Sequence, residues 1–81
     1  MTFFVYILFS NKLNKYYVGQ TEDLERRLIQ HNEGESAFTS SGTPWILIYS
    51  EEKSIRKDAI LLETKIKKRG IGRYLKDRNL I

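Results

Sequence analysis

The 81-residue chain has 41% hydrophobic residues, 30% charged residues and a formal net charge of +4, which predicts one small domain over residues 1–81. It contains no cysteine, so disulfides, thiolate zinc sites and a cysteine nucleophile are excluded. The longest apolar run, residues 3–9, is too short to span a bilayer and lacks the basic start and cleavage site of a signal peptide. We therefore expect a cytoplasmic protein without a membrane partner.

The positive charge is divided unevenly along the chain. Residues 1–52 carry four basic and seven acidic residues, for a net charge of −3, whereas residues 53–81 carry ten basic and three acidic residues, for a net charge of +7. Basic residues concentrated on one element are typical of proteins that bind a phosphate backbone. The alternative is a solvated helix face that keeps a small protein soluble.

Two segments near the N-terminus predict a β-hairpin. Residues 3–9 are aromatic and β-branched, as is typical of a strand packed on both faces. Residues 10–15 contain Asn and Lys and predict a turn, and residues 16–19 predict the returning strand.

A helix is predicted after the hairpin. Thr21 can cap its first turn, and Leu24 and Leu28, four residues apart, predict its buried stripe. We expect this helix to end near the Asn32-Glu33-Gly34 segment.

The second half of the chain predicts a strand and two helices. Residues 36–44 predict a loop because they hold Ser, Thr and Gly, and residues 45–49 predict the third strand. Ser54 is expected to cap the next helix and Gly70 to end it, and a short helix is expected over residues 72–79. The apolar residues of the longer helix recur at helical spacing: Ile55, Ala59, Leu62 and Ile66. The elements run β-β-α-β-α-α, which predicts an α+β fold with a small, mostly antiparallel three-stranded sheet flanked by helices.

The residues that could carry chemistry are phenols, guanidinium groups, one imidazole and isolated carboxylates. The chain has a single His and no Gly-rich phosphate loop, serine elbow or zinc-spaced cluster. Tyr6 and Tyr17 lie on strands that are expected to pair, so both can point from one face of the hairpin. Arg27 and His31 are four residues apart on one helix flank. Glu63 falls at the edge of an apolar stripe, which is an unusual place for a carboxylate.

Each of these residues also has a purely structural interpretation. A strand tyrosine is commonly a core aromatic with its hydroxyl at the surface. Arg27 and His31 could form an ordinary exposed helix flank. Glu63 could form a semi-buried ion pair with a nearby Lys or Arg. Taken singly, none of these residues decides between structure and chemistry.

Taken together, the residues have the spacing of a known family. Phe4-Val5-Tyr6 stands where that family has Gly-Ile-Tyr, and Tyr17-Val18-Gly19 stands where it has Tyr-Ile-Gly. Arg27 and His31 follow at the positions of the family arginine and histidine, and Glu63 lies on the later helix. The chain thus resembles the GIY-YIG nucleases, which include the nuclease domains of the excision-repair incision subunit and of homing endonucleases.

The resemblance extends to local segments and has two departures. Residues 27–34, the Phe38-Thr39-Ser40 loop and Pro44-Trp45 are similar to the small, single-domain bacterial branch of the family. Phe4 replaces the glycine of the first motif. Asn79 is the only candidate for the late asparagine that several relatives carry, and its role stays open.

The resemblance implies hydrolysis of a phosphodiester in nucleic acid, DNA in the first instance, with one divalent cation and no small-molecule cofactor. Glu63 would hold Mg²⁺ or Mn²⁺, a hard ion that accepts one carboxylate, several waters and a phosphate oxygen. Arg27 would donate to the non-bridging phosphate oxygens, since its planar fork matches phosphate geometry.

The remaining motif residues would handle water and protons. Tyr6 or Tyr17 would position water and accept its proton, which requires a phenol pKa below its ordinary value of about 10, lowered by Arg27 and the metal. His31 would take the proton onward or contact the phosphate. Gly19 would let the backbone come close to the helix that bears Arg27.

The basic C-terminal segment is then expected to track the phosphate backbone of the substrate. Its residues are Lys65, Lys67, Lys68, Arg69, Arg73 and Lys76. No base-reading element is evident, so recognition of DNA shape, as in repair or recombination, is favoured over recognition of sequence. We expect a monomer.

Two other classes of function compete with a nuclease. A non-catalytic nucleic-acid-binding module would keep the fold and the basic face without cleaving. A protein-interaction domain would use Trp45 and the Phe-rich first strand as its interface, although those aromatics are explained more simply as the core of a small chain.

Overall fold

The computed structural model describes residues 1–35 and 39–81. Their elements are β1 (Phe3–Ser10), β2 (Lys15–Thr21), α1 (Leu24–Asn32), a short 3₁₀ turn (Ser40–Gly42), β3 (Trp45–Lys53), α2 (Arg56–Arg69) and α3 (Ile71–Asp77). This order confirms the predicted α+β fold and its β-β-α-β-α-α sequence. Of the loop expected over residues 36–44, residues 36–38 lie outside the described part of the chain. None of the described helices is long and apolar enough to cross a membrane.

The sheet has the order β2-β1-β3, and both of its pairings are antiparallel. β1 is the central strand, which explains its nearly continuous apolar sequence: both faces are covered. In the pairing with β2, Tyr6 lies opposite Gly19. In the pairing with β3, a register shift between Ile7 and Leu8 leaves Ile48 as an extra residue of β3.

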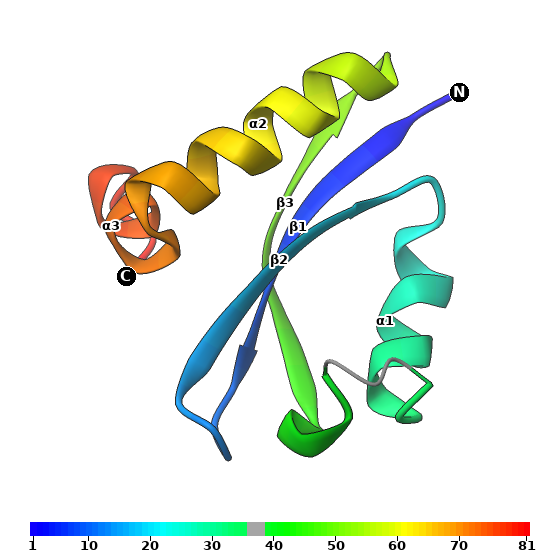
Figure 1. Ribbon diagram of the computed structural model, residues 1–81, viewed down its shortest axis with the longest axis vertical. Coiled ribbons are helices and arrows are strands. Elements are labelled where there is room, and N and C mark those ends of the chain that lie inside the picture. Colours follow the sequence, from blue (N-terminus) through cyan, green and yellow to red (C-terminus); the bar gives the residue numbers. More distant parts are fainter. Residues whose placement is uncertain (36–38) are drawn as a thin grey trace.

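Helices cover the two faces of the sheet differently. α2 and α3 lie on one side and α1 lies on the other, so that the sheet stands between them (Figure 1). The larger core, on the α2 side, contains Phe3, Val5, Ile7, Val18, Ala59, Leu62, Ile66, Tyr74 and Leu75. The smaller core, on the α1 side, contains Tyr6, Leu8 and Trp45, against which Tyr17, Leu24, Leu28 and Leu47 pack. Trp45 is therefore a core residue and does not form the exposed interface that a protein-interaction domain would need.

Gly70 ends α2 as predicted, but both predicted N-caps are wrong. The side chain of Asp23 caps α1 by accepting from the Arg26 N–H. Thr21 instead closes a turn, because its Oγ1 accepts from the Asp23 N–H at 3.1 Å. The cap position of α2 is Ile55, which makes no side-chain capping bond, and Ser54 precedes it.

Two strands are longer than predicted for a common reason. β2 continues to Thr21 and β3 continues to Lys53, although their last residues are polar. Each extension pairs with the first half of β1, Phe4 with Thr21 and Phe3 with Lys53. Pairing with a buried central strand therefore overrides the weak strand preference of these polar residues.

Candidate active site

Tyr6 and Tyr17 lie side by side on the α1 face of the sheet. Their ring centroids are 6.4 Å apart, as expected for aromatic residues on adjacent strands. Tyr6 is 1% exposed, whereas Tyr17 is only half-buried. The hairpin thus places one phenol inside the domain and the other at its surface.

Gly19 makes room for Tyr6. A Cβ at Gly19 would lie 2.6 Å from the Tyr6 hydroxyl, which is too close for a methyl group, and 3.2 Å from Cε2 of Tyr17, which is a tight contact. The sequence predicted that Gly19 allows a close approach to the helix bearing Arg27. That partner is wrong, because the nearest groups are the two tyrosines on the sheet.

His31 is the one buried residue of α1 and binds polar groups through both ring nitrogens. Nε2 lies 3.0 Å from the Tyr6 hydroxyl and Nδ1 lies 2.7 Å from Oγ1 of Thr39. Burial, and secondarily the positive charge of Arg27, holds the pKa of His31 below its ordinary value. His31 is therefore neutral at pH 7, and its burial keeps it from direct contact with a phosphate in this structure.

Thr39 is a site residue that sequence analysis missed. It is 1% exposed, and its carbonyl accepts the indole N–H of Trp45 at 2.7 Å. Its hydroxyl thus faces Nδ1 of His31 from a fixed backbone. The sequence offers two signals: Thr39 lies in a segment that resembles the small bacterial branch of the family, and a buried imidazole needs a partner on each nitrogen. Neither signal identifies Thr39 as that partner.

Arg27 lies close to both tyrosines. Its interaction with the Tyr6 phenol is the main reason that the pKa of Arg27 lies above its ordinary value, and the Tyr17 phenol raises that pKa further. Its guanidinium donates to Oε1 of Gln30 at 3.2 Å. A permanent positive charge with a planar set of donors therefore lies near the two phenols.

The Tyr6 phenol is harder to ionise than the sequence predicted. Burial raises its pKa above 10, and the charges of Tyr17 and Glu63 raise it further. The hydrogen bond from Arg27 lowers the pKa but offsets burial only in part. The expectation of a lowered phenol pKa is thus wrong for Tyr6 in the protein alone.

Glu63 extends from α2 and is paired with a neighbour one turn later. Its Oε2 lies 2.8 Å from Nζ of Lys67, and its side chain is 19% exposed. The structure thus contains the semi-buried ion pair with a nearby basic residue that is the structural interpretation of Glu63. The carboxylate is also close enough to the Tyr6 phenol to raise its pKa, although this is the smallest of the contributions.

The donor set suits one type of cation. Within residues 1–35 and 39–81, no three His, Cys, Asp or Glu side chains gather in a way that could hold a metal. Zinc, which takes three or four protein ligands, does not fit. Mg²⁺ or Mn²⁺ does fit, because such ions are held by one or two carboxylates, with water and substrate phosphate completing the shell.

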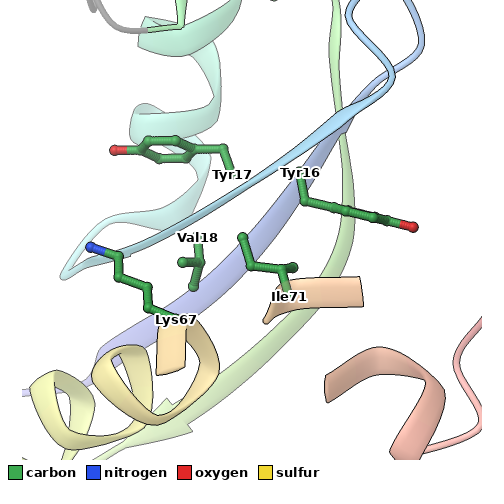
Figure 2. Close-up of a pocket in the computed structure, with 5 residues that line it drawn as sticks. All are labelled: Tyr16, Tyr17, Val18, Lys67 and Ile71. Atoms are coloured by element: carbon green, nitrogen blue, oxygen red, sulfur yellow. The ribbon is translucent and has the colours of Figure 1, made fainter. Parts of the chain in front are cut away.

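A pocket of about 370 Å³ opens beside these groups, along β2. It is lined by Tyr16, Tyr17, Val18, Lys67 and Ile71. Figure 2 shows Tyr17 on one side of β2 and Val18, Ile71 and the stem of Lys67 on the other, with the Tyr17 hydroxyl and the Lys67 ammonium both extending to the left of the view. The half-buried phenol and the ammonium group are therefore the parts of the site that a ligand can contact.

The six basic residues predicted to bind phosphates are all exposed, but they do not face one way. Lys67 lies at the pocket with Tyr17. Lys65, Lys68 and Arg69 line a different hollow together with Leu61 and Thr64. Arg69 binds Asp77 through two hydrogen bonds of 2.8 and 3.0 Å. Arg73 and Lys76 lie on α3.

Comparison with known proteins identifies the same family that the motif residues resemble. Residues 2–71 match the family described as the GIY-YIG catalytic domain. A UPF0213 protein of Bacillus velezensis is 37% identical over 65 residues, 79% of this chain and 65% of that protein. The UPF0213 protein YazA of Bacillus subtilis is 38% identical over 58 residues, 70% of this chain and 59% of that protein. The chain therefore spans less than two thirds of the length of these relatives.

A solved structure also has this fold. The solution NMR structure of the UPF0213 protein BH0048 from Bacillus halodurans superposes with a TM-score of 0.58 at 26% sequence identity. The superposition covers 99% of this chain and 83% of that chain. The three helices and the antiparallel sheet are thus shared with a relative whose name states no activity.

Proposed function

Because the chain belongs to the GIY-YIG family, which implies a nuclease-type function, we propose that it is an endonuclease that hydrolyses phosphodiester bonds in DNA. The observation that carries the proposal is that Arg27 lies close enough to both motif tyrosines to interact with them, with the Glu63 carboxylate close enough to raise the pKa of Tyr6. A guanidinium that can bind phosphate, phenols that can orient water and a carboxylate that can hold a divalent cation together suit phosphodiester hydrolysis.

Arg27 binds the scissile phosphate in this proposal. Its guanidinium donates to two non-bridging oxygens at once, and it stabilises the negative charge that grows there in the transition state. The nearby phenols of Tyr6 and Tyr17 would help to hold the guanidinium in place for this role.

Tyr17 orients the attacking water. The sequence left Tyr6 and Tyr17 as equal candidates, but Tyr17 lines the pocket whereas Tyr6 is 1% exposed. A general base must come within hydrogen-bond reach of the proton that it accepts. The exposed position of Tyr17 supports its assignment, and Tyr6 then acts by holding Arg27.

His31 and Thr39 are positioning residues. A neutral imidazole has one N–H, and in the proposed arrangement Nδ1–H donates to Thr39, which leaves Nε2 to accept the Tyr6 O–H. The Tyr6 oxygen then has its lone pairs directed at Arg27. The buried chain from Thr39 to Tyr6 thereby fixes the guanidinium without touching the substrate.

Glu63 would hold the divalent cation, Mg²⁺ or Mn²⁺. Bound there, the ion would supply charge stabilisation to the leaving oxygen. Glu63 itself would contribute one carboxylate from α2, paired with Lys67, which lines the pocket.

The substrate we propose is DNA of unusual shape, such as nicks, flaps or branches in repair or recombination. Contacts from the exposed Lys and Arg residues of α2 and α3 would be made to phosphates, which carry no sequence information. We further propose that residues 1–81 act as a single domain and as a monomer.

The test is cleavage of supercoiled, nicked, flap and branched DNA with and without Mg²⁺. We expect cleavage only with Mg²⁺, lost in Glu63→Ala and Arg27→Ala. Glu33→Ala removes an exposed carboxylate beyond the end of α1 and is the matched control. Equal cleavage by wild type and Glu63→Ala contradicts the proposal.

The ion pair between Glu63 and Lys67 favours one alternative, a module that binds nucleic acid without cleaving it. In that case the carboxylate serves only to hold Lys67. Binding of DNA by wild type and Glu63→Ala alike, with no cleavage of any substrate by wild type, would support this alternative.

A further inference from the structure

Lys67 and Glu63 form an ion pair at the one carboxylate assigned to the metal. Oε2 of Glu63 accepts from the Lys67 ammonium at 2.8 Å. A carboxylate oxygen that is bound to an ammonium group has less electron density and less space to offer a divalent ion. In the free protein, the Lys67 ammonium group therefore occupies the place that the proposed function gives to a divalent metal ion.

The two partners of this ion pair differ in mobility. The Glu63 side chain is 19% exposed, whereas the Lys67 side chain is 60% exposed. Lysine has a flexible four-carbon stem and a strongly hydrated head group. Ion pairs between side chains four residues apart on a helix contribute little to stability where water reaches the pair, and water reaches the Lys67 ammonium, so Lys67 is the partner that can leave.

Lys67 also lines the pocket next to Tyr17 (Figure 2). A phosphate group that approaches Arg27 from this pocket comes within reach of the Lys67 ammonium, because both cations lie around the same phenol. Phosphate oxygens are strong acceptors for ammonium groups. The pocket therefore offers Lys67 a second anionic partner.

We propose that Lys67 is an exchangeable counter-ion, which neutralises Glu63 in the free protein and moves to a phosphate of the nucleic acid when a divalent cation takes its place. The inference rests on the proposed function and adds regulation to it. Metal and nucleic acid then bind cooperatively, since each removes Lys67 from the site of the other. By linkage, nucleic acid raises the affinity for metal by the same factor as metal raises the affinity for nucleic acid.

The first test measures Mn²⁺ binding by the full chain without nucleic acid, by electron paramagnetic resonance of free Mn²⁺. Lys67→Met removes the charge and keeps the apolar stem. We expect it to bind Mn²⁺ about fivefold more tightly than wild type, because an adjacent positive charge no longer competes. Lys57→Met removes one charge from the first turn of α2 and is the matched control, with wild-type affinity expected.

The second test adds a nuclease-resistant phosphorothioate duplex to the same titrations. Wild type is expected to bind Mn²⁺ several-fold more tightly with the duplex than without it, and Lys67→Met is expected to lose most of this gain. If wild type and Lys67→Met bind Mn²⁺ equally well, and Glu63→Ala weakens this binding, the exchange is overturned but the metal role of Glu63 is kept. If Glu63→Ala leaves the Mn²⁺ affinity unchanged, both the exchange and the assignment of Glu63 to the metal are overturned.

Discussion

The two sides of the candidate site are built in opposite ways. On the α1 side, Tyr6, His31 and Thr39 are almost completely buried and linked by hydrogen bonds of 3.0 and 2.7 Å. On the α2 side, Glu63 forms an ion pair with Lys67, whose side chain is 60% exposed. A buried network holds geometry at a high cost of disruption, whereas an ion pair with an exposed partner can exchange that partner. In the proposed function, the α1 side would fix the position of Arg27, and the α2 side would rearrange around a metal and a phosphate.

Arg27 stands between the two sides, and its loss should have the largest effect. We predict that Arg27→Ala lowers the cleavage rate by about 100-fold or more, as removal of a group that stabilises transition-state charge does. Arg26→Ala, the adjacent exposed arginine on α1, should cleave at close to the wild-type rate. A cleavage assay with Mg²⁺ measures both, and equal losses in the two variants would remove Arg27 from the site.

The buried side should be sensitive to one methyl group. Gly19→Ala places a Cβ 2.6 Å from the Tyr6 hydroxyl, and Tyr6 cannot retreat because His31 holds it. We predict a loss of about 2–3 kcal/mol in the free energy of unfolding, typical of overpacking, measured by urea titration.

Gly72→Ala is the matched control for this variant. The nearest atom to its added Cβ is Cε2 of Tyr16 at 3.8 Å, and alanine is the better helix former. The free energy of unfolding should therefore rise by up to about 1 kcal/mol. A stable Gly19→Ala protein would show that the Tyr6 side of the site is looser than its contacts indicate.

Removal of the Thr39 hydroxyl should show whether hydrogen bonds, and not packing alone, stabilise the buried side of the site. Thr39→Val keeps the shape of the side chain and leaves Nδ1 of His31 without its 2.7 Å partner. We predict a loss of about 1–2 kcal/mol in stability and a change in the ¹⁵N shifts of the imidazole. Thr64→Val, at an exposed position on α2, should change neither quantity.

On the exposed side, substitutions should alter binding and not stability. Lys68→Ala removes an exposed charge of α2. Its predicted effect is to lower DNA affinity and to reduce the slope of log affinity against log salt by about 1. Fluorescence anisotropy at several salt concentrations measures this slope. An unchanged slope would mean that Lys68 contacts no phosphate.

The smallest effect concerns pH. The folded protein holds the pKa of His31 below 6.5, through burial and the charge of Arg27, so unfolded chains bind a proton more readily. The contribution of neutral His31 to stability is then complete above pH 6.5 and is lost as the pH falls below it toward the folded pKa. Wild type should lose more stability than His31→Gln between pH 7 and pH 5 in urea titrations. Parallel pH profiles would argue against this assignment.

The sequence predicted the elements and the grouping of the motif residues better than their local chemistry. The pairing that follows from residues 3–9 and 16–19 places Tyr6 and Tyr17 on one face, because strand side chains alternate. Burial is not readable from a motif, so the raised pKa of Tyr6 was missed. Thr39 was missed because its contact with His31 depends on the path of a loop. The cap of α1 was misplaced because Thr21 and Asp23 are both good caps and only tertiary structure selects one.

The register shift in β3 has a consequence for how the protein behaves in concentrated solution. β3 forms an outer edge of the sheet, and Ile46 and Ile48 are exposed on it. Apolar edge strands are templates for the addition of a strand from another molecule, which begins aggregation. The extra residue at Ile48 breaks the even spacing that such a strand would need, and the charged end of β3 continues this protection toward Lys53. The register shift at Ile48 thus protects the outer edge of the sheet from pairing with a strand of another molecule.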